Sequence, residues 1–205
     1  MRRELRSYFD SPIAYIVISV FLLVTGWLFF STFFVFNQAD MRNFFNLLPM
    51  TFAFVLPAIS MRLWSEERRA GTIELLMTLP VSTGAAVTGK WLAGVVFVAV
   101  ALACTLPMWW TVNYLGQPDN GIIAVSYLGA LVLAGVYLAI GGCMSALTSN
   151  QVIAFVLAVA ACFVFVTAGT PIVLDGLRAV LPEAVISAIA SPWILIIGPL
   201  MVTPL

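Results

Sequence analysis

The sequence contains no histidine and very little charge. Only 9% of its 205 residues are Asp, Glu, Lys or Arg, whereas soluble domains carry about 25%. Hydrophobic residues make up 62% of the chain, and its mean hydropathy is +1.09. This composition excludes a soluble globular protein and predicts an all-α membrane protein with several transmembrane helices. A formal net charge of zero argues against nucleic acid as a partner.

Several kinds of active site lack the residues that they need. Without histidine, the chain has no copy of the commonest general base, proton shuttle and metal ligand. The three cysteines are Cys104, Cys143 and Cys162, and each lies singly in an apolar segment without CxxC spacing. Buried structural thiols are therefore favoured over a metal or redox site. The sequence has no phosphate-binding glycine loop followed by Lys and Ser or Thr. We therefore expect no enzyme activity, no metal site and no cofactor bound by the chain itself.

Five long apolar segments without a charged residue predict five transmembrane helices. A helix needs about 20 residues to cross a bilayer. The segments comprise residues 13–36, 44–61, 91–115, 122–147 and 152–174. Ion-coupled transporters and intramembrane proteases place ionisable groups at membrane depth, so both classes are disfavoured. The energy that drives such a chain has to come from outside the bundle.

Prolines and small residues predict how these helices bend and pack. Pro49, Pro57 and Pro107 lie inside predicted helices, where proline removes a backbone hydrogen bond and causes a kink. The segment 122–147 carries small residues at four-residue spacing, which favours close contact between membrane helices. These small residues are Ala130, Ala134, Gly135, Ala139, Gly142 and Ala146.

The segment 62–90 is a long polar interruption, and we expect it to lie in water. It holds seven of the eighteen charged residues: Arg62, Glu66, Glu67, Arg68, Arg69, Glu74 and Lys90. Ser65 is a typical helix N-cap, with two glutamates in the turn that follows. Ile73, Leu76 and Met77 then form one apolar stripe at i, i+3 and i+4 spacing, and a proline ends the run. The pattern predicts a short amphipathic helix that docks on lipid or on another protein.

The two ends of the chain carry further indications. Residues 1–12 form either a short helix along the membrane surface or a basic flank that anchors the first transmembrane helix at the interface, with basic residues Arg2, Arg3 and Arg6. Seven Lys and Arg residues lie in this segment and in 62–90, against two on the other side, which predicts that both segments are cytoplasmic. In the C-terminal part, residues 175–205, a polar interfacial piece precedes 184–205, which fits either a sixth transmembrane helix or a re-entrant segment.

The polar segment resembles that of a known family of membrane proteins. Its sequence EERRAGTIELLMTLPVSTGAAVTGK looks like the loop shared by the membrane subunits of type-2 ABC exporters, in the subset of the gliding-motility permeases and the membrane subunit of the nitrous-oxide-reductase copper system. The matching residues are Glu66, Glu67, Gly71, Thr72, Glu74, Leu75, Leu76, Pro80, Gly89 and Lys90. The N-terminal sequence RRELRSYFDSPIAYIVISVFLLVTGWLFF resembles the same subset, and the resemblance covers residues 1–191.

The resemblance implies that the polar segment contains a coupling helix, which inserts into a cleft of a separate ABC ATPase subunit. The three glutamates of the motif would pair with the ATPase, its two leucines would supply apolar contacts, and Gly71 would allow a close approach of the backbone. Two alternatives stay open: the neighbouring glutamates form only a solvated turn, or the apolar residues around Leu76 pack on the chain's own helix ends. Lys90, followed by Trp91, fits an anchor whose charge reaches the membrane interface.

The resemblance also implies partners and a location. The chain would pair with a second membrane subunit, either a copy of itself or a related permease, and with ATPase subunits that bind ATP and Mg²⁺. It would lie in the bacterial inner membrane as a multi-pass protein with a cytoplasmic N-terminus. The alternative function is a non-transporting scaffold that anchors a cell-envelope apparatus. The family's usual ending is not recognisable from Ser191 onward, so we expect either a divergent C-terminus or a truncated chain.

Overall fold

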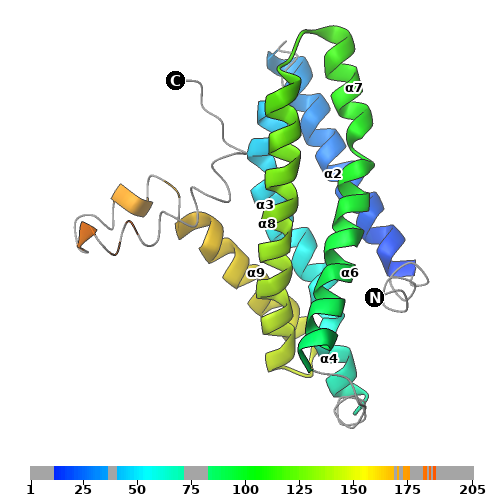
Figure 1. The fold of residues 1–205 in the computed structure, drawn as a ribbon, viewed down its shortest axis with the longest axis vertical. Coiled ribbons are helices and arrows are strands. Elements are labelled where there is room, and N and C mark those ends of the chain that lie inside the picture. The colour runs from blue at the N-terminus through cyan, green and yellow to red at the C-terminus, as the bar shows by residue number, and fades with distance from the viewer. Residues whose placement is uncertain are drawn as a thin grey trace.

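The computed structural model describes residues 12–36, 41–71, 83–168, 170, 173–175, 182–183, 185 and 187. The elements are α2 (Pro12–Phe36), α3 (Arg42–Ser60), α4 (Arg62–Arg69), α6 (Thr83–Ala103), α7 (Leu106–Leu115), α8 (Asn120–Leu147) and α9 (Gln151–Ala168). Every one of these elements is an α-helix, and they form an elongated bundle (Figure 1). The fold is therefore the all-α bundle that the composition predicts.

Five stretches of the described chain are long and apolar enough to cross a membrane, in agreement with the five predicted transmembrane helices. They are Ala14–Ser31, Arg42–Arg69, Gly84–Leu115, Asn120–Leu147 and Gln151–Ala168. Nearly all of the predicted sixth or re-entrant segment, residues 184–205, lies outside the described residues. Both ends of the polar segment 62–90 are helical, although its charged residues predicted that the spans stop at residue 61 and resume at residue 91. Met61 alone separates α4 from α3, and α6 begins at Thr83, before the predicted span. Most of the residues at the start of α6 are small or uncharged, so nothing there interrupts the helix.

The core of the bundle lies around α3 and α8. Helix α3 contacts α2, α8 and α9, and α8 contacts α3, α4, α6 and α9. Aromatic rings join the helices: Phe21 lies 5.8 Å from Phe52, and Phe45 lies edge-on to Tyr127 at 5.3 Å between ring centroids. The exposed surface of the bundle is also apolar, as expected for helices that face lipid rather than water.

The three predicted kink prolines occupy two different environments. Helix α3 continues through Pro49 and Pro57, and both are buried. The helix before Pro107 is interrupted at Cys104 and Thr105, and Pro107 lies in the first turn of α7, where its missing N–H costs no helical hydrogen bond. The Thr105 hydroxyl donates to the Leu102 carbonyl at 2.7 Å and lies 3.0 Å from the Tyr127 hydroxyl of α8.

Small residues of α8 allow close packing, though not at all the predicted positions. Ala130, Ala134 and Gly135 are buried, whereas Ala139 is exposed because it lies on the opposite side of the helix. The tightest contact involves Gly141, which the four-residue pattern omitted. A β-carbon at this position would lie 2.8 Å from the β-carbon of Ser60, so α3 and α8 require glycine here.

Candidate functional site

One end of the bundle gathers most of the charge in the described chain. Helix α4 lies there, next to the beginning of α6 and the end of α8 (Figure 1). The charged residues at this end are Arg62, Glu66, Glu67, Arg68, Arg69 and Lys90. Between this end and the opposite one, the spanning helices carry no Asp, Glu, Lys or Arg. A partner that recognises charge therefore finds it at the α4 end.

The prediction that Ser65 caps a helix is wrong. Helix α4 already begins at Arg62, and Ser65 lies inside it, with its hydroxyl donating to the Met61 carbonyl one turn earlier. The first turn of α4 therefore contains no acidic residue, and the two glutamates lie in the second turn. The cause is that Met61 alone separates α3 from α4, so that α4 begins three residues before Ser65.

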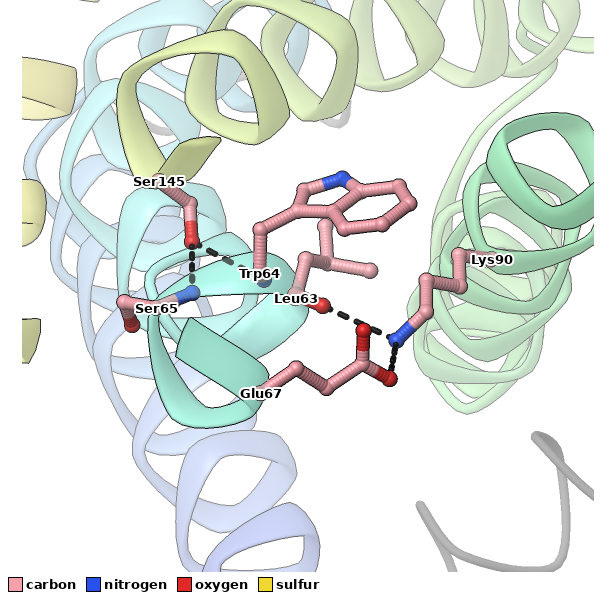
Figure 2. A network of polar contacts seen from close by, with 6 residues as sticks. All are labelled: Leu63, Trp64, Ser65, Glu67, Lys90 and Ser145. Carbon is pink, nitrogen blue, oxygen red and sulfur yellow. Dashed lines mark hydrogen bonds and ion pairs between the residues drawn. The ribbon is translucent and has the colours of Figure 1, made fainter. Parts of the chain in front are cut away.

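The capping role belongs instead to Ser145, which lies near the end of α8. Its hydroxyl oxygen accepts the backbone N–H groups of Trp64 and Ser65, both at 3.1 Å (Figure 2). The same hydroxyl donates to the Met61 carbonyl at 2.8 Å. Ser145 is fully buried, at 0% exposure. First-turn N–H groups of a helix lack an acceptor within the helix. One hydroxyl therefore attaches the beginning of α4 to α8.

A second attachment joins α4 to α6 through Lys90. The Lys90 ammonium donates to the Leu63 carbonyl at 2.9 Å and forms an ion pair with a Glu67 oxygen (Figure 2). It also lies 5.0 Å from the centre of the Trp64 ring, within the range of a cation–π interaction. The prediction of a snorkelling interface anchor is wrong for this residue, because Lys90 is only 8% exposed and its charge is satisfied inside the protein.

The other predicted residue of this pair, Trp91, connects α6 to α8. Its indole N–H donates to the Gly135 carbonyl at 2.9 Å, and the ring fills the space above Gly135 that a side chain would occupy. The ring remains about one third exposed, at 37%. Trp91 therefore packs against a neighbouring helix as well as facing outward.

Helix α4 ends at Arg69, and Gly71, two residues later, has a φ of +68°. The Ala70 N–H donates to the Glu66 carbonyl at 2.9 Å, and the Gly71 N–H donates to the Arg68 carbonyl at 3.3 Å, closing the last turn. Left-handed backbone favours glycine, so Gly71 is needed for conformation. No described atom lies within 4 Å of a β-carbon built there, so the expected close approach to a partner stays a prediction.

The predicted amphipathic helix ran past Gly71 as far as Pro80, whereas the helix that contains Glu66 and Glu67 ends at Arg69. The apolar stripe lies outside the described residues, so its helix stays a prediction. The remaining coupling residues of the motif lie outside the described residues: Thr72, Glu74, Leu75, Leu76 and Pro80. The N-terminal anchors also lie outside them: Arg2, Arg3 and Arg6.

The two neighbouring glutamates have different surroundings. Glu66 is exposed, whereas Glu67 is half-buried and bonded to Lys90. Arg68 and Arg69 are also exposed, and their charge in the last turn complements the helix dipole. The exposed charges of α4 therefore point away from the bundle, while Glu67 faces into it.

The described residues contain no group of three or more potential metal ligands. Cys162 is buried in α9 as expected, but Cys104 and Cys143 are exposed. An apolar environment in the sequence does not imply burial in a membrane helix, because its outer face is apolar as well. The prediction of three buried thiols therefore holds for one of them.

Comparison with known families adds one finding. Residues 14–201 match the family model described as ABC-2 family transporter protein. The comparisons with curated proteins and with solved structures gave no match. The matched range includes nearly all of the spanning helices and the whole α4 end.

Proposed function

We propose that this chain, which belongs to the ABC-2 transporter family, is the membrane-spanning subunit of an ATP-driven exporter. The family and the five apolar helices make it a multi-pass membrane permease component. The proposal adds that a separate ABC ATPase subunit binds ATP and Mg²⁺ and drives the permease from the α4 end. A second membrane subunit, a copy of this chain or a related one, completes the pathway.

The observation that carries the proposal is the concentration of exposed charge at the α4 end. Glu66, Arg68 and Arg69 of the polar segment are exposed, whereas the described spanning helices carry no charged residue between the α4 end and the opposite end of the bundle. Exposed charge of both signs suits recognition of another protein surface. A membrane bundle without an ionisable group at depth needs an external source of energy.

The orientation and the subset are parts of the same proposal. We place the α4 end in the cytoplasm of a bacterial inner membrane, because the positive charges of the polar segment favour that side. The similarity of the polar segment to gliding-motility and copper-system permeases supports that narrower subset.

The test is co-purification of the chain with the ABC ATPase subunit whose gene neighbours its own. The variant combines Glu74→Arg with Leu76→Asp, which reverses a charge and removes an apolar contact in the motif. The matched control combines Glu183→Arg with Val185→Asp, an exposed acidic residue and an exposed aliphatic residue at the same spacing. We expect the motif variant to lose the ATPase and the control to retain it.

The outcome separates the proposal from its alternatives. If the motif variant retains the ATPase as well as the unmodified chain does, the polar segment is not the docking element. If no ATPase is retained by the unmodified chain, an ATP-driven permease is excluded and a scaffold function is favoured.

A further inference from the structure

We propose that Ser145 and Lys90 are positioning residues that make α4, α6 and α8 move as one body when the ATPase acts. This inference rests on the proposed function. It concerns residues of α6 and α8 outside the docking segment, which is the part of the motif in residues 72–80. Their contacts with α4 are not part of the motif's expected contacts with the ATPase. The two side chains hold α4 from opposite sides, Ser145 from α8 and Lys90 from α6 (Figure 2).

The hydrogen bonds of Ser145 define the first attachment. The hydroxyl uses its one proton on the Met61 carbonyl and its lone pairs on the N–H groups of Trp64 and Ser65. A side chain without both a donor and an acceptor cannot replace this pattern. Because Ser145 is fully buried, bulk solvent does not reach its hydroxyl to replace a broken bond. Tilting α4 relative to α8 therefore breaks three bonds together.

Lys90 defines the second attachment. Its ammonium reaches the Leu63 carbonyl and the Glu67 carboxylate, which lie one turn apart on α4. Rotating α4 about its own axis would carry both acceptors away from the buried charge. An unpaired buried ammonium is costly, so the ion pair opposes that rotation. The two attachments together oppose both tilt and rotation of α4.

The positions of the two attachments on α4 determine whether a displacement of this helix is transmitted to α6 and α8. Both lie in the first six residues of α4 or at the preceding Met61, whereas the exposed residues of α4 lie toward Gly71 and the docking segment. A force applied beyond Gly71 therefore acts on a helix that is fixed at its base. We infer that the base transfers the displacement to α6 and α8 rather than absorbing it in a local bend.

The experiment measures two distances between spin labels in the chain–ATPase complex in lipid nanodiscs. The native cysteines are replaced by alanine. The first label pair, Ala70→Cys with Leu147→Cys, spans the attachment between α4 and α8, and both positions are exposed. The second pair, Tyr15→Cys with Leu147→Cys, reports the position of α8 relative to α2, and both positions are exposed. Each distance is measured without nucleotide and with ATP, Mg²⁺ and vanadate.

With both positioning residues present, we expect the second distance to shift on trapping the nucleotide and the first to stay constant. In the double variant Ser145→Ala with Lys90→Met, we expect the reverse: the first distance shifts and the shift in the second is lost. ATP hydrolysis and co-purification continue, because the docking segment is unchanged. The conservative pair Ser145→Thr with Lys90→Arg retains a hydroxyl and a cation and restores the original pattern.

A purely structural role would not produce this crossed pattern. If the double variant keeps a constant first distance and a shifting second distance, the positioning inference is overturned while the proposed function stands. If the conservative pair behaves like Ser145→Ala with Lys90→Met, it is likewise overturned. Loss of ATPase binding by the unmodified chain contradicts the proposed function itself, and the inference with it. If the double variant fails to fold, the same two distances are measured in the single variant Ser145→Ala, which removes only one oxygen atom.

Discussion

Ser60 of α3 occupies the space that a side chain on Gly141 of α8 would need. The two β-carbons would lie 2.8 Å apart, closer than folded proteins allow. Gly141 lies one helical turn before Ser145, so the close contact and the attachment of α4 share one face of α8. The close packing of α3 on α8 at Gly141 therefore helps to position Ser145 against the first turn of α4.

This contact predicts that Gly141→Ala destabilises the chain by about 2 kcal/mol, the usual cost of overpacking a tight core. Adding Ser60→Gly frees the space and should recover most of the loss, whereas Ser60→Ala leaves the β-carbon in place and recovers less. The measurement is thermal unfolding in detergent. Gly84→Ala on α6 is the control, because no atom lies within 4 Å of the point where its new β-carbon would be. Equal melting temperatures for Gly141→Ala and the control would contradict the packing.

The buried ion pair predicts a second loss of stability. Lys90→Met removes the ammonium that bonds to Glu67 and to the Leu63 carbonyl, and a hydrogen bond to a charged group contributes about 2 kcal/mol. Lys90→Arg keeps the charge and should cost less. Arg69→Met is the matched control, since this exposed residue contributes less than about 1 kcal/mol through the helix dipole. We expect a clearly lower melting temperature for Lys90→Met than for Arg69→Met, and equal values would contradict a stabilising ion pair.

The Trp91 hydrogen bond predicts a smaller effect. Trp91→Phe removes the indole N–H that Gly135 accepts and should lower the stability by about 1 kcal/mol, the net value of a typical hydrogen bond. Trp110→Phe provides the comparison, because Trp110 is 79% exposed on α7. A melting temperature that falls as much for Trp110→Phe as for Trp91→Phe would remove this hydrogen bond from the account.

The orientation in the membrane can be tested with an impermeant maleimide. In a chain without its native cysteines, Ala70→Cys marks the α4 end and Gln117→Cys marks the turn between α7 and α8. We expect Gln117→Cys to react in intact cells and Ala70→Cys to react only after the inner membrane is permeabilised. The opposite labelling would place the polar segment outside the cytoplasm.

Hydropathy was enough to predict the five spans because crossing a bilayer requires a minimum length of apolar helix. The helix boundaries around the polar segment were harder to predict from the sequence. The amino-acid composition does not indicate that only Met61 separates α3 from α4, nor that α6 begins at Thr83. Ser65 satisfied the local pattern of an N-cap, but the tertiary structure gave that role to another serine.

The residues that attach α4 could not be found from local patterns. Ser145 lies 80 positions from Ser65 in the chain and follows a run of small residues that suits helix packing alone. Lys90 next to an apolar span is typical of an interface anchor, and only the fold brings Glu67 beside it. Gly141 escaped because the four-residue pattern selected its neighbour Gly142. The coupling roles of Glu74, Leu75 and Leu76 stay predictions.

The most direct test of the account is site-specific photo-crosslinking in the assembled complex. A photoreactive amino acid at Leu76, in the docking segment, should crosslink to the ABC ATPase subunit, and the yield should change when ATP and Mg²⁺ are added. The same probe at Gln117, at the opposite end of the bundle, should give no such crosslink. Crosslinking from Gln117 and none from Leu76 would contradict a permease that an ATPase drives from the α4 end.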